Sequence, residues 1–154
     1  MSLKDKLKKL RDGGKDTKIN WGKKKKDWID SVNRLYKKIQ DDWFAELEDE
    51  ELIKFQLVPI SVVEEDIGTY SINKMEISYA TGSIVLEPVG CNIIGGEGRM
   101  DLYLNGEYSS GFMLILFREN GEDSWFTKSK QNQHEQEILT KITLEKAIEQ
   151  WIEA

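Results

Sequence analysis

Residues 98–117 read GRMDLYLNGEYSSGFMLILF, and this stretch decides the fold. Apolar residues recur in strand-like runs on both sides of Asn105-Gly106, a pair that favours a tight hairpin because both residues tolerate positive φ angles. The run from Phe112 to Phe117 is apolar on both faces, which predicts a central strand that is covered on both sides. The stretch therefore indicates antiparallel β structure.

Similar short runs lie on either side of this hairpin. Pro59 falls inside the first of them and marks an edge, a bulge or a break, because proline cannot donate a hydrogen bond to a strand ladder. Thr81-Gly82 and Asn120-Gly121 predict further turns. The expected strands occupy residues 52–63, 70–79, 83–89, 93–94, 100–104, 108–117 and 124–126. Five or more strands in succession predict an antiparallel meander.

Helical spacing precedes and follows the β region. Apolar residues from Trp28 to Leu47 fall on one face of a long amphipathic helix that starts near Lys24. The residues from Leu144 to Ile152 repeat this spacing, and Thr143 is placed to cap a final helix. We therefore predict one α+β domain over residues 23–154, in which the meander packs with a long helix in the N-terminal half and with a C-terminal helix.

The first 22 residues form a separate predicted segment. Residues 2–5 have the form of a capping box, and leucines recur from Leu3 at helical spacing. These features predict a short basic amphipathic helix, followed by a glycine-containing linker. A helix this short is marginal alone. We expect it to dock on the body of the protein, whose charge is opposite.

The net charge of −6 conceals a division along the chain. Residues 1–26 carry eleven cations and three anions, a balance of +8, whereas residues 27–154 have a balance of −14. Because opposite charge speeds the encounter with a partner, the leading hypothesis is a non-catalytic acidic binding protein, such as an immunity-like or antitoxin-like inhibitor of a basic protein. The candidate partner-binding residues are Glu48, Asp49, Glu50, Glu51, Glu64, Glu65 and Asp66.

A second hypothesis is a nucleic-acid or anionic-surface binder that uses the basic residues 1–26. Its lysine run lies between Trp21 and Trp28, and basic residues with interleaved aromatic rings can neutralise phosphates and stack on bases. The glycine-rich residues 95–98 lack the ending of a phosphate-binding loop and predict a turn, which places Arg99 beside it. The candidate anion-binding residues are Lys23, Lys24, Lys25, Lys26 and Arg99.

A third hypothesis is a carboxylate-dependent enzyme, with Glu87 and Asp101 at the ends of predicted strands. Cys91 is the only cysteine and His134 the only histidine. Intrachain disulfides, cysteine zinc clusters and histidine-pair metal sites therefore cannot be assembled. We predict no catalytic residue, no metal site and no cofactor, and we interpret the acidic runs as solvated surface.

The sequence also bears on location. No apolar stretch follows the charged start of the chain, so we expect no secretory signal peptide. The longest apolar run, Phe112 to Phe117, is far shorter than a membrane-spanning helix requires. The cytoplasm is the expected location.

Overall fold

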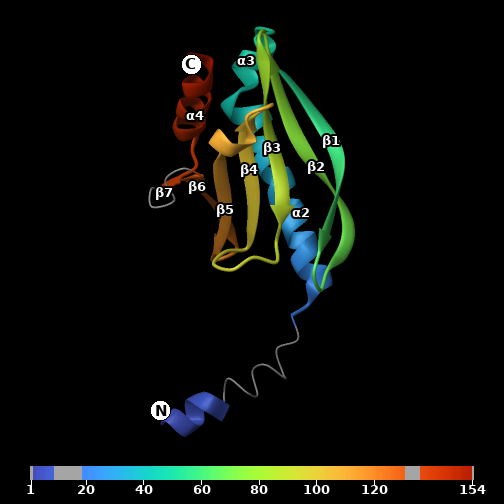
Figure 1. Ribbon diagram of the computed structural model, residues 1–154, viewed down its shortest axis with the longest axis vertical. Helices are drawn as coiled ribbons and strands as arrows, with labels where there is room; N and C mark the ends of the chain where they lie inside the picture. Colours follow the sequence, from blue (N-terminus) through green and yellow to red (C-terminus); the bar gives the residue numbers. More distant parts are fainter. Residues whose placement is uncertain (1, 9–18, 131–135, 154) are drawn as a thin grey trace.

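The computed structural model describes residues 2–8, 19–130 and 136–153. It confirms the α+β fold: antiparallel strands form one sheet in which each strand pairs with the next along the chain (Figure 1). Pro59 lies in an edge strand, as predicted. The strands are β1 (Lys54–Glu64), β2 (Gly68–Tyr79), β3 (Gly82–Gly90), β4 (Gly98–Leu104), β5 (Phe112–Glu119), β6 (Glu122–Ser129) and β7 (Gln136–Ile138).

From Trp21 onward in the described part of the chain, three helical segments precede the sheet in the sequence, one lies between β4 and β5, and one follows β7. They are α2 (Trp21–Lys38), the π-helical turn η1 (Ile39–Trp43), α3 (Ala45–Asp49), the short 3-10 helix η2 (Tyr108–Ser110) and α4 (Lys141–Glu153). None of the described helices is both long enough and apolar enough to cross a membrane.

The long helix predicted from Lys24 differs at both ends. It begins earlier, because the Asn20 side chain accepts a hydrogen bond from the Lys23 N–H at 3.0 Å and caps it. It is interrupted at Phe44, whose N–H donates to the Ile39 carbonyl at 2.8 Å and whose ring is buried. A π turn shifts the faces of a helix relative to the preceding turns, and α3 therefore continues in a separate piece.

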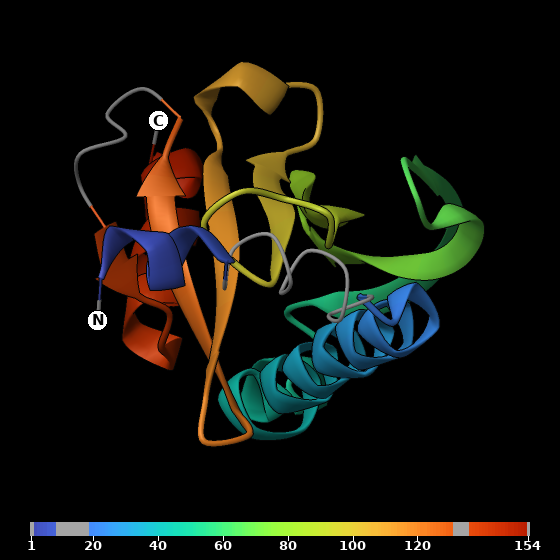
Figure 2. The same ribbon diagram turned by 90° about the horizontal axis from the view of Figure 1, so that it is seen from below.

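Helices α2 and α4 pack on the same face of the sheet. The ring of Trp28 in α2 lies 5.9 Å from that of Trp125 in β6, and Trp151 in α4 lies 5.9 Å from Phe112 in β5. Trp125 is the cross-strand partner of Leu116, which shares a face of β5 with Phe112. Figure 2 shows the curved sheet, with the β1–β2 hairpin bent around beside α2.

A close contact between α2 and β4 fixes the position of this helix. Trp28 is completely buried, and a Cβ added at Gly98 would lie only 2.2 Å from its ring. A glycine is required here because any side chain would occupy the space of the indole. The indole therefore packs directly against the backbone of β4.

The β4–β5 connection is wider than the predicted tight hairpin. Gly106 has the expected positive φ of 93°, but strand pairing resumes only at Phe112, opposite Leu102. Tyr108 lies in η2 instead of a strand, and its hydroxyl donates a hydrogen bond to the Asp101 carboxylate. Asn105 and Gly106 do form a turn, in which the Glu107 N–H donates to the Leu104 carbonyl at 2.8 Å, but η2 follows this turn instead of a paired strand.

Strand β5 is an interior strand that is covered unequally. Leu114 and Leu116 are buried, whereas Met113 and Ile115 on the other face are half-buried. Both α2 and α4 pack on the first face, so the second face keeps part of its accessibility. The expectation that both sides of this strand are covered holds fully for the first face and in part for the second.

Two further local expectations are corrected. Residues 93–94 do not form a strand but lead into the turn at Gly95, which has the predicted positive φ, 83°.

The last helix is capped by Thr140 rather than Thr143. The Thr143 N–H donates to the Thr140 hydroxyl at 3.2 Å, and the Thr140 N–H donates to the Thr143 hydroxyl at 2.7 Å. This reciprocal pair is a capping box that starts the helix one turn earlier.

Residues 3–8 form the predicted short helix. The Ser2 hydroxyl caps it by accepting a hydrogen bond from the Asp5 N–H at 3.2 Å. Leu3 and Leu7 are 71% and 56% exposed, so this helix does not pack on the body and the expected docking is wrong. Residues 9–18, which include most of the predicted linker, lie outside the described part of the chain.

We expect Gly98→Ala to lower the free energy of unfolding by about 1–3 kcal/mol, because the new methyl group overlaps the Trp28 ring. Gly22→Ala is the control, since its Cβ would make an ordinary 3.5 Å contact with Asn20. Alanine is also favoured over glycine in helices by roughly 0.5–1 kcal/mol. Urea unfolding measures both changes. An unchanged midpoint for Gly98→Ala would contradict the fixed contact between α2 and β4.

Candidate binding groove

An apolar groove of about 320 Å³ lies between α3, the paired strands β2 and β3, and α4. This volume is at the lower end of the range of about 300–1,000 Å³ that is typical of ligand sites. Its lining residues come from three distant parts of the sequence: Phe44, Leu47, Leu52 and Ile53; Ile77, Tyr79 and Ile84; and Glu145, Ile148, Glu149 and Ile152. We refer to this set as the groove.

The groove exposes apolar side chains to solvent. Leu52 and Ile152, on its two sides, are each 56% exposed. Large apolar side chains that converge on one hollow mark an interaction site more strongly than scattered ones. The groove is therefore a candidate binding surface.

The charge of the groove has one sign. Glu145 and Glu149 are its only charged lining residues, and they lie one turn apart on α4. The opposite wall includes Leu47 and Leu52, which bracket the acidic residues 48–51 at the end of α3. An apolar floor between two acidic edges is complementary to a ligand that is apolar on one side and positively charged on the other.

Sequence reasoning identified only one edge of this groove. Residues 48–51 were expected to bind a partner, and they lie beside it. Ile148 and Ile152 were assigned to the core face of the last helix, but Ile152 is largely exposed. No local signal predicts that α3 and α4 lie across a groove, because they are about a hundred residues apart in the chain.

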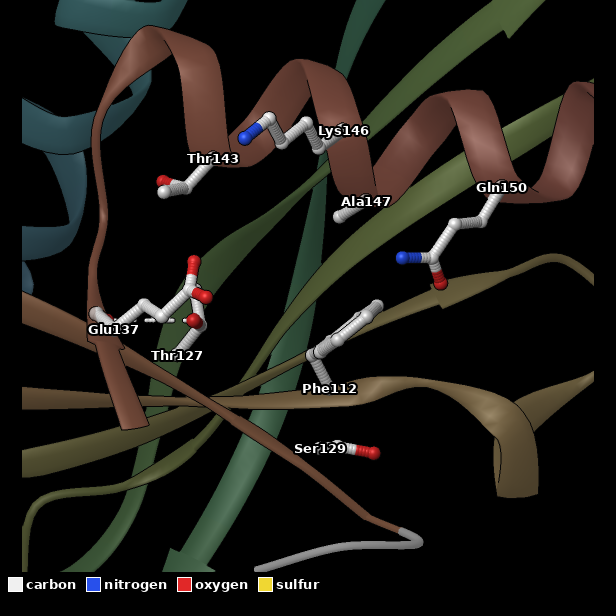
Figure 3. Close-up of a pocket in the computed structure, with 8 residues that line it drawn as sticks. All are labelled: Phe112, Thr127, Ser129, Glu137, Thr143, Lys146, Ala147 and Gln150. Carbon is white, nitrogen blue, oxygen red and sulfur yellow. Dashed lines mark hydrogen bonds between the residues drawn. The ribbon is translucent and has the colours of Figure 1, made fainter. Parts of the chain in front are cut away.

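A second, smaller pocket lies on the other flank of α4 (Figure 3). It has a volume of about 150 Å³, and six of its eight lining residues are polar. Its hydroxyl groups already serve the fold: Thr127 donates to the Glu137 carbonyl at 3.3 Å, and Thr143 donates to the Ile138 carbonyl at 3.1 Å. These bonds secure β7 and the start of α4 and leave the larger groove as the better candidate.

The structure does not bring the two predicted acidic groups together. Residues 48–51 precede β1, and residues 64–66 end it. Strand β1 has eleven residues, so at about 3.3 Å per residue the two groups lie roughly 35 Å apart. They cannot contact the same small ligand.

Glu64 belongs to an internal hydrogen-bond network. Its carboxylate accepts hydrogen bonds from the N–H groups of Cys91 and Asn92, both at 2.8 Å, and from the Tyr70 hydroxyl. Burial, together with the nearby Glu64 charge, raises the pKa of the Cys91 thiol to about 12. The same two causes raise the pKa of Tyr70. Glu64 thus ties the end of β1 to the segment after β3, whereas Glu65 and Asp66 are exposed in the turn.

The predicted basic residues lie at the start of α2. Lys23 and Lys26 are exposed, and Lys26 pairs with Asp30 at 3.7 Å. Lys24 lies over the Trp21 ring, 5.5 Å from its centroid, and Lys25 is half-buried. Two of the four lysines are therefore open to an anionic ligand at this helix end.

Arg99 is bound to a buried carboxylate on the sheet. Its Nε and Nη2 atoms donate to Asp101 at 3.1 and 3.0 Å. The other Asp101 oxygen accepts from the Tyr108 hydroxyl and lies 3.6 Å from the Lys130 amine. The hydrogen bond to Asp101, with burial, raises the pKa of Tyr108 to about 12. The cluster holds Arg99 in place and is not an open anion site.

The register places the two carboxylates proposed for catalysis opposite each other. Glu87 in β3 is the cross-strand partner of Asp101 in β4. Because Arg99, Tyr108 and Lys130 engage the Asp101 carboxylate, this carboxylate is not free to act as an acid or base. The hypothesis of a carboxylate-dependent enzyme gains no support here.

Side chains that can ligate a metal ion are scattered over the described residues. Within residues 2–8, 19–130 and 136–153, no three of the histidine, cysteine, aspartate and glutamate side chains are grouped to hold a metal ion. His134 lies outside these ranges.

We expect Glu64→Ala to lower the free energy of unfolding by about 2–3 kcal/mol, because the N–H groups of Cys91 and Asn92 lose a charged acceptor. Glu65→Ala is the matched control, because its exposed side chain should change stability by about 0.5 kcal/mol or less. Urea unfolding of both variants at pH 7 gives the comparison. Equal stabilities would show that the Glu64 network does not secure β1.

Comparison of the chain with known protein families, with curated proteins and with solved structures finds no match.

Proposed function

We propose that this protein is a non-catalytic binding protein whose groove receives an apolar, positively charged segment of a basic protein partner. The observation that carries this proposal is the composition of the groove, whose only charged lining residues are two glutamates. An immunity-like or antitoxin-like inhibitor is the class that this surface fits best, because such a protein acts by occupying its partner.

The apolar floor supplies the binding free energy. Burial of apolar surface contributes about 25 cal/mol per Å², and Leu52 and Ile152 have much of their surface still to bury. An amphipathic helix is the ligand that fits such a surface, because its side chains at i, i+3, i+4 and i+7 enter a hydrophobic groove together.

The acidic edges supply selectivity. Glu145 and Glu149 lie on one side, and residues 48–51 lie beside the other. Charges at the rim of an interface mainly raise the association rate and reject partners of the wrong sign. A partner helix with lysines or arginines flanking its apolar stripe is therefore favoured over an acidic one.

A pair of synthetic helices tests this proposal directly. We expect a labelled leucine–lysine amphipathic peptide to bind the full chain, and a leucine–glutamate peptide of the same pattern to bind at least about tenfold more weakly. The double variant Leu52→Ser/Ile152→Ser should lose affinity by about tenfold or more, since two exposed anchors are removed. Fluorescence anisotropy measures the Kd.

Ile94→Ser is the control, because Ile94 is fully exposed and does not line the groove. Its affinity for the lysine peptide should equal that of the unchanged protein. Equal binding of the two peptides, or equal binding by the groove double variant, would refute the proposed function.

A second candidate function is the binding of nucleic acid or an anionic surface at the start of α2. It rests on Lys23 and Lys26, which are exposed at the positive end of the helix dipole. Lys23→Glu/Lys26→Glu should abolish salt-sensitive binding to single-stranded DNA or to anionic vesicles. Glu119→Lys/Glu122→Lys adds positive charge at the exposed β5–β6 turn and should not create such binding. Equal signals from all three proteins would rule this function out.

A further inference from the structure

We propose that the groove also binds the N-terminal helix, residues 3–8, of a second copy of this chain. This inference rests on the same groove as the proposed function and names one of its ligands. The two then compete: a copy whose groove holds another copy's helix cannot receive a partner segment.

The N-terminal helix is a formed but unpartnered ligand. Its N-cap is formed, since the Ser2 hydroxyl accepts from the Asp5 N–H at 3.2 Å and donates to the Asp5 carboxylate at 2.9 Å. Leu3 and Leu7 remain exposed. Helices this short have little stability of their own, so burial of the two leucines is what would hold the helix in place.

The helix and the groove have complementary chemistry. Leu3 and Leu7 are four residues apart and project from one face of the helix, with Lys4, Lys6 and Lys8 around them. The groove presents an apolar floor with Glu145 and Glu149 as its charged residues. The leucines of the helix would therefore contact the apolar floor of the groove, and its lysines would lie near the two glutamates.

Chain length favours a second copy over the helix's own groove. The chain joins the body at Asn20, the N-cap of α2, and α2 with η1 then runs 23 residues to the other end, about 35 Å at 1.5 Å per residue. The groove lies at that far end, beside Phe44. The twelve residue steps from Lys8 to Asn20 can span about 40 Å only when the chain is fully extended in a straight line.

Docking on the same chain would therefore require nearly complete extension along the body. A groove on a second copy imposes no such requirement. Reciprocal exchange, in which each copy binds the other's helix, forms a closed dimer with two-fold symmetry. Because both contacts form in one complex, the second is intramolecular and adds strongly to the first.

Sedimentation equilibrium of the full chain tests this inference. We expect the average mass to rise from monomer toward dimer with concentration, and the association to weaken as salt increases. Leu7→Ser removes the ligand and Leu52→Ser weakens the groove, so each should raise the dimer Kd by about tenfold or more. Ile94→Ser is the control and should associate like the unchanged chain.

Mixing the two variants separates exchange from any other contact. Leu7→Ser retains an intact groove and Leu52→Ser retains an intact helix, so an equal mixture should contain a heterodimer joined by one exchanged helix. Its association should exceed that of either variant alone at the same total concentration. Thermal unfolding should show that both variants remain folded, because both side chains are exposed.

Three results would overturn the inference: a monomer at every concentration, a Leu7→Ser variant that associates normally, or a mixture no more associated than its parts. A lowered melting temperature of monomeric Leu7→Ser would instead assign the helix to its own chain. Binding of the lysine peptide without self-association would leave the proposed function standing and remove only this inference. Self-association without peptide binding would leave this inference standing and remove the proposed function.

Discussion

The contact between the Trp28 indole and the backbone of Gly98 is the constraint on which the rest of the structure depends. Trp28 also meets Trp125 at 5.9 Å, so one buried ring joins α2 to β4 and β6. Once this ring is in place, the direction of α2 across the sheet is set. The core then forms around it, with Leu114 and Leu116 of β5 facing the same layer.

Polar contacts secure the two ends of this arrangement. The Asp123 carboxylate in β6 accepts hydrogen bonds from Ser31 and Arg34 of α2, both at 3.0 Å. At the start of α2, the Glu64 carboxylate ties the end of β1 to the Cys91 backbone. With α2 held in this way, the π turn and the break at Phe44 direct α3 away from the line of the long helix, and the groove forms where α3 faces α4.

The sequence predicted what depends on near neighbours. Asn120-Gly121 forms the expected tight turn, with φ angles of 53° and 79°, because the conformation is set by those two residues alone. Asn105-Gly106 also forms a turn, with the Glu107 N–H donating to the Leu104 carbonyl at 2.8 Å, but the expected tight hairpin does not follow, because strand pairing resumes only at Phe112. Glu64 was predicted to lie on the acidic surface, since its partners at residues 91 and 92 are remote in the chain.

The groove shows why charge alone predicts a binding surface incompletely. The balance of −14 over residues 27–154 led to the prediction that residues 48–51 and 64–66 contact a basic partner, yet carboxylates surrounded by water contribute little free energy to binding. Glu145 and Glu149 differ because apolar side chains such as Ile148 lie between them and make a ligand exclude water there. The balance of +8 over residues 1–26 is opposite in sign to the charge of the groove. A basic helix with exposed leucines and an acidic groove with exposed isoleucines, carried by one chain, leave two apolar surfaces in solvent whose burial against each other is favourable.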